Sequence, residues 1–269
     1  MSKVVLITGG SSGIGKSVGE FLVNNGFVVY GTSRNVENYK NHPFKLVSLD
    51  VNNVESIVNA VNKIILNEGK LDILINNAGR GITGPIEETP TEEMRNVFET
   101  NFFGAIEVMK AVLPQMRTQK SGLIINITSI AGYMGLPYRG IYSATKGALE
   151  LVTEALRMEV REFGIEVTNV APGDFATNIA SGRYHTPVFE ESDYKKNYQN
   201  NLNLMDAHVN NGSNPIQMAE AIFKIIQTPK PKIHYKVGSF MQKFSIILKR
   251  LLPDTMYENL LMKHYKIKR

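Results

Sequence analysis

The chain has 269 residues, 43% of them hydrophobic and 20% charged, which is the composition of an ordinary globular domain large enough for a buried core. It has no cysteine, and this excludes a disulfide framework and cysteine-based metal sites. Residues 224–269 hold 11 Lys or Arg against two acidic residues, so the net charge of +5 divides into +9 there and −4 before them. The residues before 224 form most of the folded domain, and their net charge of −4 argues against a nucleic-acid partner.

The first expected element is the apolar run Lys3–Thr8, which glycines follow at once. This run is too short for the core of a signal peptide. No window of the sequence approaches the roughly 18 uninterrupted apolar residues of a membrane span. We therefore expect a soluble, cytoplasmic protein.

Beyond this run, short apolar segments alternate with longer segments of helical periodicity. Such alternation predicts right-handed crossovers and an α/β fold, a doubly wound parallel sheet of about seven strands with helices on both faces. Several of the apolar runs are continuous, as in strands that helices cover on both sides. The expected strands are Lys3–Thr8, Phe27–Thr32, Phe44–Leu49, Leu71–Ile75, Leu123–Thr128, Ile165–Val170 and Lys232–Val237, and the expected helices hold Ile14–Leu22, Ile57–Ile65, Thr91–Arg117 and Tyr142–Phe163.

Two regions depart from this alternation, and they set the expected domain organisation. Residues 181–215 are polar and long for a plain connection, a pattern typical of a functional lid or of disorder. Residues 239–269 predict one or two basic amphipathic helices, broken at Pro253. We therefore expect a single catalytic domain over residues 1–238, with 181–215 as its substrate lid, and a C-terminal extension over 239–269.

The loop after the first strand has the pattern of a dinucleotide-binding turn. Its glycines allow a tight turn and a close approach of the backbone, and the helix that follows offers free N–H groups to a pyrophosphate. A glycine-rich loop alone is weak evidence, because an ordinary strand–helix turn has similar needs. The candidate cofactor-binding residues of this loop are Gly9, Ser11, Ser12, Gly13, Ile14 and Gly15.

The glycine spacing and the motifs that follow it resemble those of the short-chain dehydrogenase/reductase family, in its compact single-domain type. The resemblance extends from residue 3 to about residue 177 and implies a Rossmann-type fold. It also implies hydride transfer between a nicotinamide cofactor and a carbonyl or alcohol substrate. The matching residues are Thr8–Gly15, Asn76–Gly79, Asn101, Ser129, Tyr142–Lys146 and Pro172–Gly173.

The end of the second strand bears on which nicotinamide cofactor is used. An NAD-dependent enzyme usually has an acidic residue there for the ribose hydroxyls, and this chain has none until Glu37. Arg34 can instead offer its planar guanidinium to the 2′-phosphate of NADP. The alternative is an ordinary solvated arginine. We expect NADP(H), and the resemblance adds the cofactor contacts Asp50, Val51, Asn77, Ala78, Gly79, Pro172, Gly173, Phe175 and Thr177.

Tyr142 and Lys146 are four residues apart on an expected helix, so both project from one face. A nearby ammonium favours the phenolate form of a tyrosine, which suits proton exchange. The resemblance implies that Tyr142 transfers the proton, that Lys146 also reaches the nicotinamide ribose, and that Tyr142 belongs to the cofactor site as well. It further implies that Ser129 hydrogen-bonds the substrate oxygen and that Asn101 holds a water for proton relay. Taken singly, such a Tyr–Lys pair is more often a surface contact.

The five histidines are scattered and show no metal-binding spacing, so no metal site is expected. His185 lies in the expected lid, where a substrate contact is an open alternative. The substrate itself is expected to be hydrophobic, because Phe175 and the residues after Ser129 are mostly apolar or aromatic. The same residues could instead pack on the body of the domain. Those residues are Tyr133, Met134, Leu136, Pro137 and Tyr138.

The amphipathic stretch after Gly238 has two readings. It either packs on the domain or on another subunit, or it makes a peripheral membrane contact. Similarly placed extensions in steroid and retinol dehydrogenases suggest a steroid-, retinoid- or lipid-like substrate. The resemblance also implies a homodimer or homotetramer. Two other functions stay open: a non-catalytic NADP(H)-binding sensor on the same fold, and a sugar-nucleotide epimerase, which shares the Tyr–Lys pair.

Overall fold

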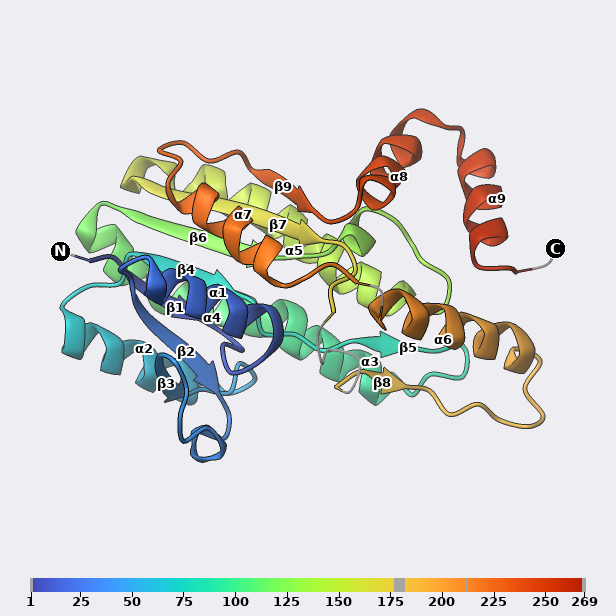
Figure 1. Ribbon diagram of the computed structural model, residues 1–269, viewed down its shortest axis with the longest axis horizontal. Helices are drawn as coiled ribbons and strands as arrows, with labels where there is room; N and C mark the ends of the chain where they lie inside the picture. The colour runs from blue at the N-terminus through green and yellow to red at the C-terminus, as the bar shows by residue number, and fades with distance from the viewer. Residues whose placement is uncertain (1, 177–181, 211, 268–269) are drawn as a thin grey trace.

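The computed structural model describes residues 2–176, 182–210 and 212–267, and for residues 206–210 it describes only the backbone. Its central sheet has seven parallel strands in the order β3-β2-β1-β4-β6-β7-β9 (Figure 1). The predicted Rossmann-type sheet of about seven strands is thus confirmed. The strands are β1 (Val4–Ile7), β2 (Val28–Ser33), β3 (Lys45–Ser48), β4 (Ile73–Asn76), β6 (Gly122–Ile127), β7 (Ile165–Pro172) and β9 (His234–Val237).

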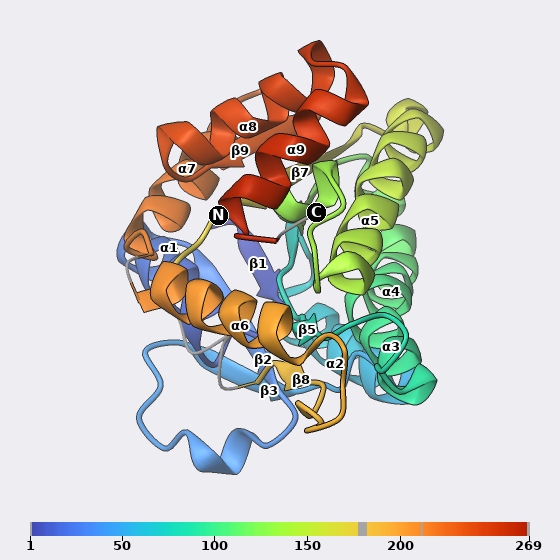
Figure 2. The ribbon, with the colours of Figure 1, turned by 90° about the vertical axis from the view of Figure 1, so that its right-hand side faces the viewer.

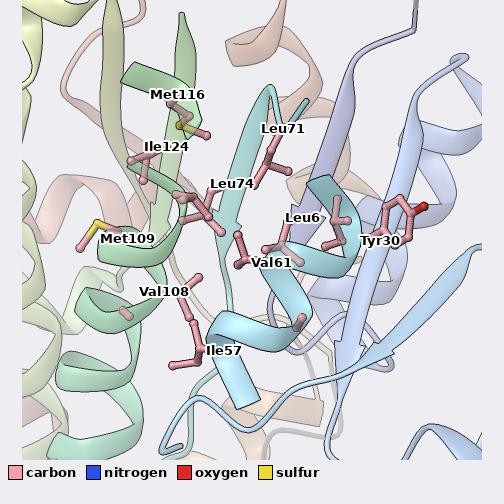
Figure 3. Packing of buried hydrophobic residues seen from close by; sticks show 14 of the residues in the cluster. Leu6, Tyr30, Ile57, Val61, Leu71, Leu74, Val108, Met109, Met116 and Ile124 are labelled. Atoms are coloured by element: carbon pink, nitrogen blue, oxygen red, sulfur yellow. The ribbon is translucent and has the colours of Figure 1, made fainter. Parts of the chain in front are cut away.

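Helices cover both faces of the sheet, which explains why the strands read as continuous apolar runs. Successive side chains of a strand point to opposite faces, so neighbours such as Val5 and Leu6 of β1 enter different hydrophobic clusters. Leu6, Leu74 and Ile124 pack against α2 and α4 in the cluster of Figure 3. The covering helices are α2 (Val54–Glu68), α4 (Gly104–Gln119) and α5 (Gly140–Glu159) on one face, and α1 (Gly13–Asn24) and α7 (Ile216–Ile226) on the other.

One expected helix differs from the structure. The region Thr91–Arg117, predicted as a single helix, consists of α3 (Thr91–Phe98), a π-helical turn over Glu99–Phe103, and α4. A π turn holds one more residue per turn than an α-helix, and such turns occur frequently at functional sites. The apolar periodicity on either side did not reveal it, because each flanking segment is helical by itself.

The carboxyl ends of the strands carry two additional layers (Figure 2). A two-stranded parallel sheet joins β5 (Ile82–Thr83) to β8 (Tyr184–His185), and α6 (Lys195–Asn210) follows. On the other side lie α8 (Phe240–Leu251) and α9 (Asp254–His264), which meet at Pro253. Within the described part of the chain, no helix has both the length and the apolar character needed to cross a membrane.

Candidate active site

The glycine-rich loop lies between β1 and the N-terminus of α1, at the carboxyl edge of the sheet. Gly9 has a φ of +63°, a left-handed conformation that glycine adopts without strain. A side chain at Gly15 would collide with the carbonyl oxygen of Gly9, so only a glycine there lets the loop close onto α1. The loop thus brings backbone N–H groups and the start of a helix to the place where a pyrophosphate would bind.

A second loop, after β4, is fastened to the glycine-rich loop. The Thr8 hydroxyl accepts hydrogen bonds from the backbone N–H groups of Asn77 and Ala78, at 2.9 and 3.0 Å. In return, the Asn77 amide donates to the carbonyl oxygens of Thr8 and Gly9, at 3.0 and 3.1 Å. The Asn77 side chain is therefore engaged in joining the two loops, in addition to the ribose contact expected of it.

The residues expected at the adenosine end lie along the same edge. Arg34 follows β2 directly and is exposed, and the first acidic residue after it, Glu37, is exposed as well. Asp50 follows β3, and its carboxylate accepts from the backbone N–H of Asn52 at 3.0 Å. Val51 packs closely against Gly104 at the start of α4. Ser11 and Ser12 lie in the glycine-rich loop, with Ser12 as the N-cap residue of α1.

Asn101 lies in the π turn and is buried. Its amide oxygen accepts from the backbone N–H of Arg80 at 2.8 Å, and its amide nitrogen donates to the Arg80 carbonyl at 2.9 Å. A third bond, at 3.2 Å, reaches the hydroxyl of Thr145 on α5. Gly79 lies against both the Asn101 amide and the ammonium of Lys146, so the structure brings these two candidate residues together.

Lys146 is a buried cation, with only 5% of its surface exposed. Its ammonium donates to the carbonyl oxygen of Ile127, at the end of β6, over 2.9 Å. Burial removes water from the ammonium and lowers the pKa of Lys146 from its usual 10.5 to about 8. Since an ammonium has three donors, Lys146 can hold this carbonyl and still reach other acceptors.

Tyr142 and Ser129 line one cleft that opens to solvent. Ser129 follows β6, and its hydroxyl accepts from the backbone N–H of Ala131 at 3.1 Å. Lys146, one turn after Tyr142 on α5, lies buried beside this cleft. The remaining residues that line the cleft are Ile14, Gly81, Ile82, Arg139, Pro172, Gly173, Asp174, Phe175 and Arg183.

The turn after β7 forms the far wall of the cleft. The backbone N–H of Gly173 donates to the carbonyl of Val237 at 2.8 Å, which ties this turn to β9. Phe175 is buried and pairs with Ser213. Thr177, the last expected contact of this turn, lies outside the described residues.

None of the five residues expected in the substrate pocket after Ser129 lines the cleft. Three of them, Tyr133, Met134 and Leu136, pack in a separate cluster with Ile246 and Tyr257 of the last two helices. These residues pack on the body of the protein, which is the alternative that the sequence left open. Ile14 and Phe175, by contrast, do line the cleft.

Three charged residues of the cleft were missed by the sequence analysis: Arg139, Asp174 and Arg183. Arg139 is three residues before Tyr142, and its guanidinium lies 5.5 Å from the centre of the Tyr142 ring. Asp174 lies inside the turn Pro172–Phe175, whose other residues the sequence predicts as cofactor contacts. For these two, the position inside or beside a motif was an available signal; for Arg183, within the polar lid region, there was none. Among the described residues, no group of His, Asp and Glu side chains is arranged to hold a metal ion.

Comparisons with known proteins agree with this geometry. The family model described as short chain dehydrogenase matches residues 3–187. A 3-ketodihydrosphingosine reductase from Bacteroides thetaiotaomicron is 41% identical over 268 residues, which cover 99% of both chains. The crystal structure of a short-chain dehydrogenase from Streptomyces avermitilis superposes with a TM-score of 0.85 at 32% identity, covering 99% of this chain and 97% of that one. The structure of ElxO with NADP bound gives a TM-score of 0.71 at 29% identity, over 88% of this chain and 97% of that one.

The resemblance seen in the sequence motifs is therefore confirmed. The family match covers the glycine-rich loop, the Tyr–Lys helix and the turn after β7, which the fold gathers at one edge of the sheet. The chain belongs to the short-chain dehydrogenase/reductase family and is an oxidoreductase that acts on an alcohol or carbonyl group.

Proposed function

We propose that this protein is an NADP(H)-dependent reductase of a hydrophobic, lipid-like ketone. The observation that carries the proposal is that Tyr142 and Ser129 line one cleft, with the glycine-rich loop at one end and the buried ammonium of Lys146 beside Tyr142. The bound dinucleotide supplies the hydride. Everything else asked of the site is binding, orientation and proton transfer, which the chain's own residues can perform.

In this proposal Tyr142 delivers a proton to the substrate oxygen, and Ser129 donates a hydrogen bond to that oxygen as negative charge develops on it. The ammonium of Lys146 stabilises the phenolate left on Tyr142. Asn101 holds the segment around Arg80 and meets Lys146 at Gly79, where a bound water would connect the ammonium to solvent. These roles remain predictions.

The preference for NADP(H) rests on Arg34. It is exposed directly after β2, with Glu37 as the first acidic residue beyond it, so a 2′-phosphate there would meet a cation before any carboxylate. ElxO, a related structure, contains NADP. We propose 3-ketodihydrosphingosine, a long-chain amino ketone, as the first substrate to test, because a 3-ketodihydrosphingosine reductase matches the whole chain.

The test is NADPH oxidation by the purified protein with 3-ketodihydrosphingosine, a steroid ketone, retinal and a small polar ketone, each repeated with NADH. Rapid turnover of the long-chain ketone with NADPH, and slow turnover with NADH, is the expected result. Tyr142→Phe serves as the matched control for non-enzymatic oxidation. If NADPH binds and no carbonyl is reduced, the sensor alternative is favoured; if neither cofactor binds, the proposal is wrong.

We further propose that this is a cytoplasmic protein whose C-terminal helices touch membrane surfaces. Phe240 and Leu251 of α8 are 73% and 74% exposed, and Met256 and Leu260 of α9 are exposed apolar side chains as well. The same two helices carry basic residues, which suit an anionic lipid surface: Lys243, Lys249, Arg250 and Lys263. The double variant Phe240→Glu, Leu251→Glu should lose flotation with phosphatidylserine vesicles, while Leu66→Glu, an exposed change on α2, should keep it. Equal flotation of both variants would contradict the membrane contact.

We also propose a homodimer or homotetramer that pairs through α4 and α5. Phe103, the last residue of the π turn before α4, and Leu151 and Met158 of α5 are exposed apolar side chains on this layer. Pairing would remove them from water. Light scattering should report a multiple of the 30.0 kDa chain mass, and Leu151→Glu with Met158→Glu should shift the protein to the monomer.

A further inference from the structure

The helices α8 and α9 lie across the carboxyl edge of the sheet (Figure 2). Their outward side is the exposed apolar surface described above, but their inward side is packed. Ile246 of α8 and Tyr257 of α9 are buried in one cluster with Ile130, Met134 and Ala171. Ile130 directly follows Ser129, and Ala171 directly precedes Pro172, so this cluster supports both walls of the cleft from behind.

Gln242 connects α8 to the turn after β7. Its side-chain N–H donates to a carboxylate oxygen of Asp174 over 2.7 Å. Its side-chain oxygen completes the capping box of α8 with Ser239. A side chain at Gly173 would collide with that oxygen, so the glycine of this turn makes room for Gln242. One residue of the extension thus holds a charged group of the cleft wall.

Tyr265 makes the second connection. It follows α9 and is only 6% exposed. Burial raises the pKa of Tyr265, and the nearby guanidinium of Arg139 acts in the opposite direction, so the phenol of Tyr265 faces that cation. The backbone oxygen of Tyr265 also accepts a hydrogen bond from the buried side-chain amide of Asn201 on α6, at 3.5 Å. Since Arg139 lies against the ring of Tyr142, Tyr265 is one contact away from the proposed proton donor.

We infer that the inward face of α8–α9 supports the wall of the substrate cleft from behind, and that Gln242 and Tyr265 are the positioning residues that fix Asp174 and Arg139 within that wall. The inference rests on the proposed function. Asp174 and Arg139 are charged groups that share the cleft with Tyr142 and Ser129, so their orientation decides how the polar end of a substrate sits. The extension then contributes to substrate selection from within the protein, separately from any membrane contact of its outward face.

Two substitutions test the inference with little change in shape. Tyr265→Phe removes only the hydroxyl that lies near Arg139. Gln242→Glu keeps the capping box of α8, since glutamate also serves at this position, but it sets a carboxylate against Asp174. Each removes a polar contact with a charged group of the cleft, so each should raise the KM for 3-ketodihydrosphingosine about tenfold while kcat stays within about threefold.

The double variant Gln242→Glu, Asp174→Asn provides the rescue. It reverses the direction of the hydrogen bond between residues 242 and 174, and KM should return toward that of Asp174→Asn alone. Met241→Ala, a change of an exposed neighbour on α8, is the matched control and should behave as wild type. Thermal unfolding of every variant separates a local effect from loss of the fold.

The outcomes are distinct. A wild-type protein that reduces none of the ketones would contradict the proposed function. If the wild type is active and both Tyr265→Phe and Gln242→Glu have the same KM as the wild type, only the cleft-wall inference is overturned. An increase in KM that the double variant leaves unrescued, or a loss of kcat that merely follows a lower unfolding temperature, would also overturn it.

Discussion

The ammonium of Lys146 donates to the backbone carbonyl of Ile127 over 2.9 Å, in the interior of the protein. This contact ties the middle of α5 to the end of β6, two residues before Ser129. It therefore fixes the Tyr–Lys helix relative to the strand that carries the third candidate catalytic group. The same contact places a positive charge where there is little water, which costs stability.

Replacing Lys146 with methionine should stabilise the protein while abolishing its activity. The pKa of Lys146 is lowered to about 8, so at pH 7 the folded protein holds a buried cation that the unfolded chain would hold in water. We expect Lys146→Met to raise the unfolding temperature of the cofactor-free protein by about 5 °C at pH 7. The gain should shrink above pH 8, where the native lysine loses its proton. Calorimetry at pH 7 and pH 9.5 checks this, with the exposed Lys63→Met as control; an unchanged or lower unfolding temperature at pH 7 would contradict it.

Tyr142→Phe should lower kcat for ketone reduction by about 10²–10⁴-fold, because it removes the proposed proton donor and leaves the ring in place. NADPH binding, followed by fluorescence, should change little. The partly exposed Tyr39→Phe, far from the cleft, is the control. Appreciable turnover by the Tyr142 variant would show that another group supplies the proton.

Arg34→Ser should lower kcat/KM with NADPH by about 10–100-fold and leave the value with NADH nearly unchanged. The reason is the loss of a charge-assisted hydrogen bond to the 2′-phosphate, which NADH lacks. Arg34→Lys should fall between the two, since it keeps the charge without the planar fork. If both cofactors lose activity equally, Arg34 serves the loop structure and not the phosphate.

Glu150→Gln should flatten the dependence of stability on pH. Burial is the main cause that raises the pKa of Glu150 from its usual 4.5 to about 7, and the Thr128 hydroxyl donates to its carboxyl over 3.0 Å. The folded protein therefore binds a proton there that the unfolded chain releases. The stabilisation from this bound proton on Glu150 is complete below about pH 4.5 and is lost as the pH rises through 7. Tyr133, Glu154 and Lys236 face the same group.

Denaturant titrations at pH 5 and pH 8 provide the measurement. The wild type should lose up to about 3 kcal/mol more than Glu150→Gln between these two values. Glu159→Gln, an exposed change on the same helix, should follow the wild type. Parallel pH curves for wild type and Glu150→Gln would mean that this carboxyl is solvated or already paired.

The sheet could be predicted from the sequence because its signal is local. The run Leu71–Ile75 anticipated β4 and Ile165–Val170 anticipated β7, each to within a few residues, since a strand covered on both faces must be apolar throughout. The tiny strands β5 and β8 could not be predicted. Each has two residues, and they pair across about 100 residues of chain, so nothing local marks them.

The candidate site could be predicted where its chemistry depends on residues at fixed spacing, as with Tyr142 and Lys146 on one helix face. The residues that support the cleft wall could not be predicted from the sequence. Arg139 and Asp174 lie against Tyr265 and Gln242, which are distant in sequence and belong to a segment whose pattern also fitted a helix that lies on a membrane surface. Amphipathic spacing shows that a helix has an apolar face, but not what covers that face.

The π turn at Glu99–Phe103 sets the angular phase between α3 and α4. In an α-helix each residue advances about 100°, so one residue more or fewer rotates everything beyond it by that amount. Deleting Thr100 would restore plain α geometry, but it would turn either Asn101 away from Arg80 or the core face of α4 away from the sheet. A single-residue deletion at this point is therefore not a local change. Natural variation in length should be tolerated at the surface loops and not here.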